Sequence, residues 1–329
     1  MLYSIIVPVF NRPDEMAELL ESMTRQTFGH FEVIIVEDGS TTTCETVVEH
    51  YADKLHIDYH KTPNGGPGLA RNRGAARARG EYLIFLDSDC ILPPHYIIEV
   101  HVGIVTLEAD AFGGPDRASA DFTPVQKAIN YSMTSFLTTG GIRGGKRELE
   151  KFHPRSFNMG IRREVYETLH GFSAMRFGED IDFSIRLYEA GCRVKLFPAA
   201  WVYHKRRTDW KKFWRQVYNS GIARINLYEK HPRSLKPVHL MPAGFTLGTA
   251  ACIAGTPFVQ WAILPPLIFA ASLCIDSAVK NKSLKIGLLS VVASYIQLVG
   301  YGCGFLSAAW NRIILKKGEY SAFNKTFYD

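Results

Sequence analysis

The sequence predicts an α/β protein with a mostly parallel sheet, followed by membrane-associated helices. Short apolar runs typical of buried strands alternate with helical patterns over residues 1–205, at the spacing of β-α-β units. Acidic or turn residues follow several of these runs directly. Further along the chain, residues 238–275 and 286–311 contain no Asp, Glu, Lys or Arg, which is typical of segments that enter a membrane.

The spacing of apolar residues predicts the order of the elements. In the first part of the chain these are a strand over residues 4–10, a helix over 13–27, a strand over 31–36, a helix over 42–52, a strand over 57–60, a helix carrying Arg71, Arg73, Arg77 and Arg79, and a strand over 82–86. Helices over 94–107 and 179–190 and a short strand over 111–114 follow. Residues 138–146 are rich in glycine and are predicted to form a mobile loop.

The chemistry is expected at the end of the central strand. Tyr82 to Leu86 is a continuous apolar run, and Asp87 and Asp89 follow it at once. Ligands of open α/β sheets gather outside the carboxyl ends of the strands. Two carboxylates at this position suit a hard divalent cation such as Mg²⁺ or Mn²⁺, which shares its ligands with substrate phosphates. The alternative is a solvated loop or a helix cap, since Asp is common in both.

A second acidic cluster opens the helix predicted over residues 179–190. Glu179, Asp180 and Asp182 lie in its first turn, where negative charge also complements the helix dipole. The functional interpretation requires one of these carboxylates to face the cleft as a base.

Two common nucleotide-binding motifs, the dinucleotide fingerprint and the phosphate-binding loop, are missing from the sequence. Arg71 stands where a dinucleotide fingerprint needs its third glycine, and there is no Gly-Lys-Ser/Thr for a phosphate-binding loop.

The net charge of +6 is concentrated beside the apolar segments. Residues 205–236 hold ten Lys and Arg against two Asp and Glu. A protein that is basic only in this region is expected at a cytoplasmic membrane surface and not on nucleic acid. The six cysteines have no metal-site or disulfide spacing and are expected to be reduced thiols of a cytosol-facing protein.

The chain is predicted to contain four segments. Residues 1–207 form the catalytic domain, 208–236 an amphipathic basic interface helix and linker, 237–311 transmembrane or re-entrant helices, and 312–329 a basic cytoplasmic tail. Gly255-Thr256-Pro257 divides the first apolar stretch into two helices, and residues 286–311 form a third. The loop before the third helix and the tail after it are both basic, so three full crossings conflict with the positive-inside rule. Either the third segment is re-entrant around Gly300, Gly302 and Gly304, or the rule is broken.

Several motifs in order resemble the family 2 glycosyltransferases of GT-A fold. They are Pro8-Val9-Phe10-Asn11, Glu37-Asp38-Gly39-Ser40, Gly68-Leu69-Ala70-Arg71-Asn72, Asp87-Ser88-Asp89, Gly171-Phe172 and Glu179-Asp180. The resemblance implies transfer of a sugar from a nucleotide diphosphate sugar with inversion and without a covalent intermediate. The Gln-x-x-Arg-Trp motif of processive polysaccharide synthases is not completed after Gln216, which favours transfer of a single sugar.

The resemblance also implies roles for individual residues. The nucleotide sugar would be held by Pro8, Val9, Asn11, Glu37, Asp38, Arg71, Asp87 and Ser88, although Glu37 departs from the usual Asp. A Mn²⁺ or Mg²⁺ ion would be bound by Asp89, Asp87 and His204. Asp180 would act as the catalytic base, with Glu179 beside it. The acceptor would contact Asn158, Gly160, Trp214 and Arg215.

We therefore expect an enzyme of the glycosyltransferase class at the inner or plasma membrane, with its catalytic domain in the cytoplasm. The donor is a nucleotide diphosphate sugar, with UDP-sugar favoured and GDP-sugar as the alternative, and the acceptor is lipid-linked or a glycolipid. Three other functions stay open: a sugar-phosphate nucleotidyltransferase, a processive polysaccharide synthase, and a non-catalytic membrane scaffold.

Overall fold

The computed structural model describes residues 1–117, 122–139, 152–205, 209–320 and 322. These residues divide into two compact units. The first holds the described residues of 1–117 and 152–205, and the second holds 122–139 and the helices from residue 209 onward. Helix α5 (Pro124–Thr134) thus belongs with the C-terminal helices although it lies inside the segment predicted as the catalytic domain. The predicted loop over 138–146 falls mostly outside the described residues.

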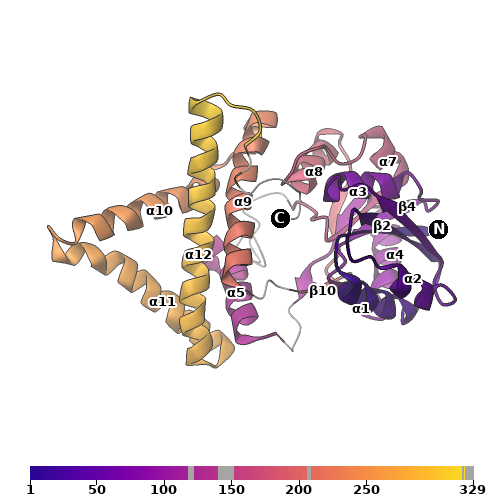
Figure 1. Cartoon of the computed structure of the whole chain (residues 1–329), viewed down its shortest axis with the longest axis horizontal. Helices are drawn as coiled ribbons and strands as arrows, with labels where there is room; N and C mark the ends of the chain where they lie inside the picture. The colour runs from indigo at the N-terminus through magenta and orange to yellow at the C-terminus, as the bar shows by residue number, and fades with distance from the viewer. Residues whose placement is uncertain (118–121, 140–151, 206–208, 321, 323–329) are drawn as a thin grey trace. The chain divides into compact units, whose positions relative to one another are not determined.

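The first unit is built on a seven-stranded sheet with the order β3-β2-β1-β4-β8-β6-β9 (Figure 1). Its strands are β1 (Tyr3–Val9), β2 (Phe31–Asp38), β3 (Ile57–Thr62), β4 (Tyr82–Leu86), β6 (Ala111–Gly113), β8 (Asn158–Arg162) and β9 (Val194–Leu196). β3, β2, β1 and β4 are parallel, whereas β8 is antiparallel to both β4 and β6. The predicted fold class is confirmed. The antiparallel strand β8 was not predicted from the sequence.

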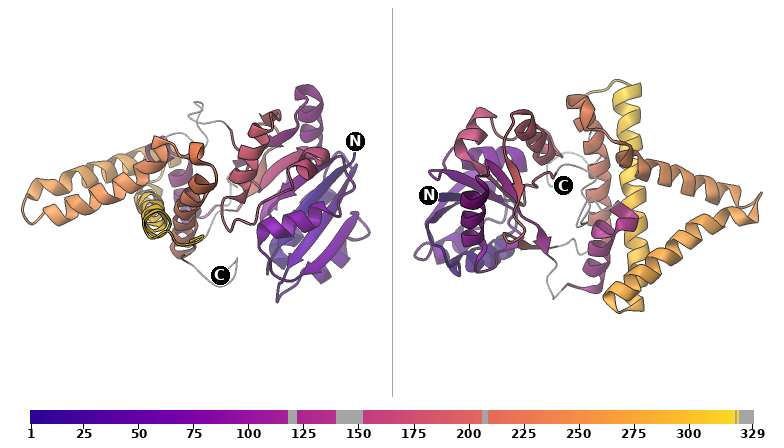
Figure 2. Two further views of the ribbon diagram at one scale, coloured as in Figure 1. Left: turned by 90° about the horizontal axis from the view of Figure 1, so that it is seen from above. Right: turned by 180° about the vertical axis from the view of Figure 1, so that it is seen from behind.

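Helices cover both faces of this sheet, as Figure 2 shows. They are α1 (Pro13–Thr24), α2 (Glu45–Tyr51), α3 (Pro67–Ala75), α4 (Tyr96–Leu107), α7 (Arg163–Thr168) and α8 (Glu179–Glu189). Helices α1, α2 and α4 share one core with the side chains on one face of the strands. Helices α3, α7 and α8 share a second core with the opposite face. All five residues of β4 are buried, as expected for a strand covered on both sides.

A small three-stranded sheet joins three segments that the sequence did not identify as strands. It has the order β5-β10-β7, with β5 at Cys90–Ile91, β7 at Asp116–Arg117 and β10 at Val202–His204. β10 is antiparallel to β5, and His204 lies opposite Cys90 in the register. This pairing brings His204 next to the Asp87–Asp89 motif, more than a hundred residues away in the chain.

The second unit consists of helices. They are α5, α6 (Phe136–Thr139), α9 (Trp210–Lys230), η1 (Pro232–Ser234), α10 (Pro237–Gly255), η2 (Gln260–Ile263), α11 (Leu264–Asn281), α12 (Leu284–Ala309) and the π-helical turn η3 (Trp310–Ile314). Within the described residues, three helical segments are long and apolar enough to cross a membrane: Pro237–Gly255, Gln260–Asn281 and Leu284–Ile314. The division of the first apolar stretch at Gly255-Thr256-Pro257 agrees with the end of α10 at Gly255.

Two expectations about these helices need revision. The apolar side of α9 was expected to face a membrane interface, but Phe213 and Val217 are buried against α5 and α12. The aromatic residue Trp214 packs close to Gly300 of α12. The third apolar segment was expected to turn back around its glycines as one of two alternatives. Instead, α12 is one continuous helix through Gly300, Gly302 and Gly304.

Candidate active site

Asp87 and Asp89 follow β4 at the carboxyl end of the parallel strands, as predicted, and each is held by an arginine. The Asp87 carboxylate accepts a hydrogen bond from Arg71 Nη2 at 2.7 Å. Arg12 Nη1 donates to Asp89 Oδ2 at 2.7 Å, and His204 Nε2 lies 3.1 Å from Asp89 Oδ1. Ser88 between them is buried. The strand end therefore presents two carboxylates beside two guanidinium groups and one imidazole.

Asp89 and His204 offer the donors of a metal site. Single ligand atoms of Asp89, Cys90 and His204 lie within 4.8 Å of one another. Burial, together with the charges of Asp89 and Asp87, raises the pKa of the Cys90 thiol well above its usual range. Cys90 therefore stays protonated and does not suit a hard cation. A carboxylate and an imidazole do suit a divalent ion that keeps other oxygen ligands from a substrate, so the residues fit the expected cation.

His204 is held in place by its neighbours. Its ring stacks on Phe157, with 4.8 Å between the ring centroids and an interplanar angle of 20°. The antiparallel pairing of β10 with β5 fixes the backbone on which the ring sits. The ring is about one fifth exposed, with 19% of its side-chain surface accessible. It is therefore oriented toward Asp89 while it remains reachable from solvent.

Arg71 joins the two acidic clusters that the sequence predicted. Its guanidinium bonds Asp87 at 2.7 Å and Glu179 Oε1 at 3.1 Å. Burial by itself lowers the pKa of Arg71, but the carboxylates of Asp87 and Glu179 raise it by more, and the group stays charged. Only 3% of the Arg71 surface is exposed, and its guanidinium links the end of β4 to the start of α8. Direct contact of Arg71 with the nucleobase or the diphosphate of a donor stays a prediction.

The N-terminus of α8 places Glu179 and Asp180 in this region. Gly178 is the N-cap residue and has φ of 87°, a left-handed conformation that a side chain would strain. Asp180 Oδ1 accepts from the backbone of Ile181 at 2.8 Å, and Asp180 Oδ2 lies 2.7 Å from Arg155 Nε. Asp180 is oriented by these two contacts. Asp182, by contrast, is fully buried and pairs with Arg186 on the same helix at 2.9 Å, so it stabilises α8.

Glu179 differs from an ordinary surface carboxylate. Burial and the negative charge of Asp180 raise the pKa of Glu179 to about 7, although Arg71 and Arg155 oppose the shift. Glu179 can therefore carry a proton near neutral pH. A protonated Glu179 cannot take the proton of an acceptor hydroxyl, which favours its neighbour Asp180 as the base.

We expect Glu179 to make stability fall as pH rises from 4.5, the ordinary value for Glu, to about 7. In this window the unfolded chain has released the proton and the folded chain still holds it, so the stabilisation present below 4.5 is lost by the time pH passes about 7. One proton gives a slope approaching about 1.4 kcal/mol per pH unit. The measurement is the unfolding midpoint of the detergent-solubilised chain against pH. Glu179→Gln should remove this component, and an identical pH profile for wild type and variant would contradict the assignment.

The residues predicted around the nucleoside meet at the ends of β1 and β2. Pro8 and Val9 are buried in β1. Asn11 has φ of 53°, and its side-chain oxygen accepts from the backbone of Thr41 at 2.8 Å. This hydrogen bond joins the loop after β1 to the loop after β2. The predicted residues thus lie at the carboxyl ends of the adjacent strands β1 and β2 and in the loop after β1.

The carboxylates of Glu37 and Asp38 accept hydrogen bonds from other groups of the protein. Glu37 Oε2 accepts from the backbone of Cys44 and from the hydroxyl of Tyr59, both at 2.8 Å. The two oxygens of Asp38 accept from the backbone of Gly65 and of Gly66, each at 2.8 Å. Both carboxylates therefore shape the loops of the proposed nucleoside pocket. Their contact with a nucleoside stays a prediction.

The residues predicted for the acceptor belong to two different units. Asn158 is fully buried in β8, where it accepts from the hydroxyl of Tyr96 at 2.7 Å and donates to Ala200 at 2.9 Å. Gly160 lies on the same strand, against the Phe112 ring. These contacts give Asn158 and Gly160 a packing role. Trp214 and Arg215 are on α9 in the second unit.

Two arginines of the candidate site were missed by sequence reasoning. Arg12 follows Asn11 and pairs with Asp89, and Arg155 precedes β8 and pairs with Asp180. Arg12 directly follows the Pro8–Asn11 motif that the sequence had singled out, so its position was a usable signal. Arg155 does not belong to any motif that the sequence analysis recognised. Its role depends on the ion pair with Asp180, which forms only when the two segments pack together.

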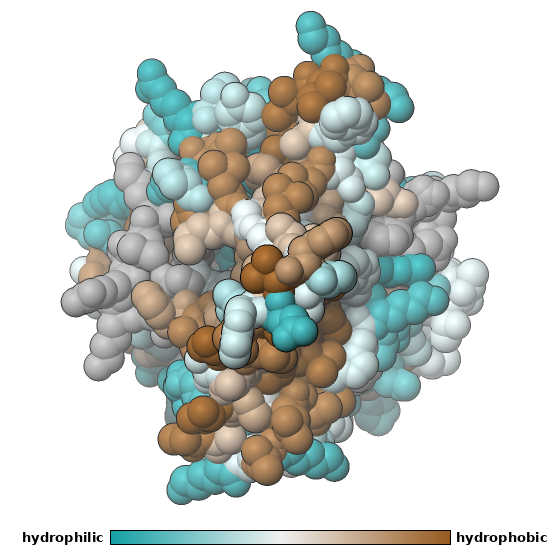
Figure 3. Space-filling model, turned by 90° about the vertical axis from the view of Figure 1, so that its left-hand side faces the viewer, coloured by the Kyte–Doolittle hydropathy of each residue, from teal (hydrophilic) through white to brown (hydrophobic). Residues whose placement is uncertain are grey.

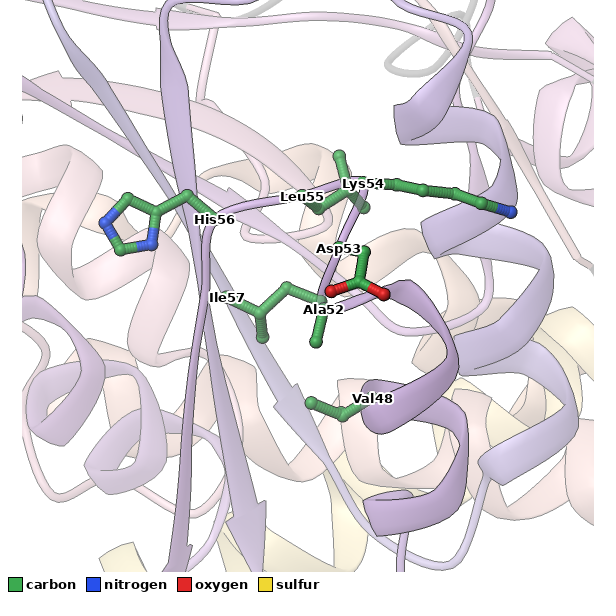
Figure 4. Close-up of a pocket in the computed structure, with 7 residues that line it drawn as sticks. All are labelled: Val48, Ala52, Asp53, Lys54, Leu55, His56 and Ile57. Carbon is green, nitrogen blue, oxygen red and sulfur yellow. The ribbon is translucent and has the colours of Figure 1, made fainter.

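The surface pocket in Figure 4 is elsewhere. It is lined by Val48, Ala52, Asp53, Lys54, Leu55, His56 and Ile57. These residues lie on α2, on the start of β3 and between them, whereas Asp87 and Asp89 follow β4 and Glu179 and Asp180 begin α8. This pocket does not include any residue of the candidate site.

A mostly parallel sheet with acidic side chains at its carboxyl ends, beside a candidate metal site, defines a GT-A type protein. The solved structures agree on the fold. A mannosyltransferase, PcManGT from Pyrobaculum calidifontis, in complex with GDP-Man and Mn²⁺, has a TM-score of 0.63 at 17% identity, over 89% of this chain and 86% of that one. TarS 1–349 of S. aureus in complex with UDP-GlcNAc has a TM-score of 0.50 at 21% identity, over 92% and 90%.

The chain belongs to glycosyl transferase family 2. The model of that family matches residues 4–169, and the model of glycosyl transferase family group 2 matches residues 156–275. A probable glycosyltransferase of Bacillus subtilis (strain 168), YdaM, is 27% identical over 235 residues, 68% of this chain. The poly(ribitol-phosphate) beta-N-acetylglucosaminyltransferase TarS of Staphylococcus aureus is 41% identical over 93 residues, 27% of this chain. The matched segments span 55% and 16% of these two relatives.

Proposed function

We propose that the protein is a membrane-associated inverting glycosyltransferase. It moves one sugar from a nucleotide diphosphate sugar, with UDP-sugar favoured and GDP-sugar as the alternative, to a lipid-linked or glycolipid acceptor. One observation carries the proposal: Arg71 joins Asp87, at the strand end beside the candidate metal site, to Glu179, the neighbour of the candidate base Asp180. This link supports a site in which the donor phosphates bind beside the base.

The proposed reaction is a single displacement. The acceptor hydroxyl oxygen attacks the anomeric carbon of the sugar while Asp180 takes its proton. The bond from the anomeric carbon to the phosphate oxygen breaks, and its electron pair leaves with the nucleoside diphosphate. Asp89 and His204 would hold a divalent cation, which would supply Lewis-acid stabilisation of the negative charge that develops on the diphosphate. Arg155 keeps the Asp180 carboxylate oriented.

The relatives support the donor class. The solved structures of similar fold hold GDP-Man with Mn²⁺ in one case and UDP-GlcNAc in the other. The lipid-linked acceptor is supported by the apolar helices of the second unit, three of which are long enough to cross a membrane. A membrane-bound enzyme meets a membrane-bound acceptor at a raised effective concentration.

The test is a transfer assay with the full chain in membranes. We expect label from a UDP- or GDP-sugar to enter the lipid extract only with Mn²⁺ or Mg²⁺, and the anomeric configuration of the product, read by NMR, to be inverted. Equal transfer to a water-soluble acceptor would contradict the lipid acceptor, and a retained anomer would contradict the mechanism. Release of pyrophosphate from a nucleoside triphosphate and a sugar phosphate would identify a nucleotidyltransferase instead. Addition of many sugars per acceptor would identify a processive synthase.

A further inference from the structure

Each apolar helix of the second unit is flanked by positive charge. Arg233 and Lys236 precede α10, Lys280 and Lys282 lie at the turn from α11 to α12, and Lys316 and Lys317 follow η3. Three crossings would put some of these basic groups on the outer side of the membrane, against the positive-inside rule. The conflict disappears if α10 and α11 cross and α12 does not, because the chain then returns to its starting side before Lys280 and stays there.

The α10–α11 hairpin has the character of an inserted element. In Pro237–Gly255 and in Gln260–Asn281, only 11% of the apolar stretch is buried within the protein, whereas 44% is buried in Leu284–Ile314, which contains α12. At the tip, Phe258 is 88% and Trp261 74% exposed. The two helices leave α12 at different points and converge at this tip (Figure 1). Apolar side chains cover much of the face shown in Figure 3.

Helix α12 is instead packed along α9, with contacts so close that only glycine fits. A Cβ on Gly304 would lie 2.0 Å from the carbonyl oxygen of Tyr218, and a Cβ on Gly221 would lie 2.2 Å from that of Tyr301. The hydroxyl of Tyr218 donates to Ser307 at 2.8 Å. Further along, Arg312 forms an ion pair with Glu229. These contacts run in the same order along both helices, so α9 and α12 are parallel neighbours.

Helix α9 cannot enter hydrocarbon together with α12 without a large cost. It carries Lys211, Lys212, Arg215, Arg224 and Lys230 along its length. A charged side chain at the centre of a bilayer costs about 2.5–3.5 kcal/mol on insertion scales. Because α12 is fixed to α9 over most of its length, α12 is held at the level of the headgroups too.

The remaining exposed apolar residues of α12 fit this position. Leu284, Leu288 and Val292 are exposed at intervals of four residues, which places them in one stripe. A helix that lies in the interface buries one such stripe and needs no apolar surface around its whole circumference. The adjoining end of α11 is also polar: Asp276 accepts from the Tyr131 hydroxyl at 2.6 Å and pairs with Lys280 at 2.8 Å.

We propose that the α10–α11 hairpin inserts into the bilayer and that α12 lies with α9 along its surface. Lys236, Lys282 and Lys317 are then all on one side of the membrane. The partner is a bilayer with anionic headgroups, since the exposed ammonium groups of Lys280 and Lys282 flank the hairpin where it meets α12. The proposal concerns the second unit alone and does not depend on the reaction catalysed by the first.

The test places single cysteines on the full chain in sealed membrane vesicles. Lys236→Cys, Lys282→Cys and Lys317→Cys are each made in a chain whose Cys192, Cys252, Cys274 and Cys303 are changed to Ala, while the fully buried Cys44 and Cys90 are kept. We expect a membrane-impermeant maleimide to label all three from the same side, with complete loss of labelling when the reagent is confined to the other side. Labelling of Lys282→Cys and Lys317→Cys from opposite sides would overturn the proposal. Reaction of every variant in detergent serves as the control for accessibility.

Two further measurements do not require any cysteine substitution. Trypsin added to one face of vesicles holding the unaltered chain should cut at Lys282 and at Lys316 from the same face, and cuts from opposite faces would overturn the proposal.

Lipids brominated on their acyl chains should quench the tryptophan emission of the full chain, and Trp261→Phe should remove part of the quenched emission. The matched control is Trp201→Phe in the first unit, where Trp201 stacks with Arg117. A quenched fraction unchanged by Trp261→Phe would place the tip outside the hydrocarbon and overturn the insertion of the hairpin.

Discussion

Asp89→Asn is expected to abolish cation-dependent binding of the nucleotide diphosphate sugar and to lower turnover by more than about 100-fold. The reason for this magnitude is that even outer-shell partners of a metal are worth about 10–100-fold in affinity or activity, and Asp89 is proposed to bind the ion directly. The substitution removes the negative charge but keeps an oxygen that can accept from Arg12, which now donates to Asp89 Oδ2 at 2.7 Å. The fold should therefore survive.

Binding of the donor with and without Mn²⁺, followed by thermal shift, measures this effect because ligand bound to the native state raises the midpoint. Asp58→Asn is the matched control. Asp58 is also a carboxylate paired with an arginine, at 2.7 Å from Arg77 Nε, but it lies on the outer strand β3. The control should keep wild-type binding and turnover. Wild-type turnover of Asp89→Asn in Mn²⁺ would show that the metal assignment is wrong.

Asp180→Asn is expected to retain donor binding and to lose transfer by about 10²–10⁴-fold, the usual contribution of general base catalysis. The amide cannot take the proton of the acceptor hydroxyl, but it has the same shape as the carboxylate. Its oxygen can still accept from Ile181 at the start of α8, where Asp180 Oδ1 now does so at 2.8 Å. Transfer should therefore fail at the chemical step while the N-terminus of α8 stays folded.

Rapid-mixing measurement of a single turnover separates the chemical step from donor binding in this variant. Glu189→Gln, at the other end of α8, removes a carboxylate from the same helix and should leave both quantities unchanged. If Asp180→Asn transfers sugar at the wild-type rate, a different residue takes the proton. A loss of donor binding in parallel with transfer would instead assign Asp180 to the binding of the donor.

The sequence was sufficient for the parallel part of the fold. The apolar run of β4 is continuous because both faces of the strand are covered, and such a run can be recognised without any partner. The acids after β2 and β4 were predicted at one edge of the sheet because parallel strands end on the same side. Strand β8 was missed because Asn158 and Gly160 interrupt its apolar character. Its position between β4 and β6 depends on pairing with residues far away in the chain.

The site was predicted in part for the same reason. Asp87, Asp89, Glu179 and Asp180 are recognisable because they stand next to regular elements, at a strand end or in the first turn of a helix. The groups that hold them are not recognisable in this way. Arg155 reaches Asp180 from 25 positions away, and Arg71 reaches Glu179 across 108 positions. Such ion pairs arise when separate elements pack together, and local patterns contain no information about them.

Local patterns in the sequence are enough for the fold class, the strand ends that carry the acidic residues, and the apolar helices at residues 238–275 and 286–311. These follow from periodicity and composition, which act over a few residues at a time. Only the packing of distant elements shows which acids share Arg71, that His204 lies beside Asp89, and that Glu37 and Asp38 support loops. It also paired α12 with α9, because Gly221 and Gly304 let the two backbones approach closely. Hydropathy alone cannot distinguish a helix that crosses a bilayer from one whose apolar side is already covered by a charged neighbour.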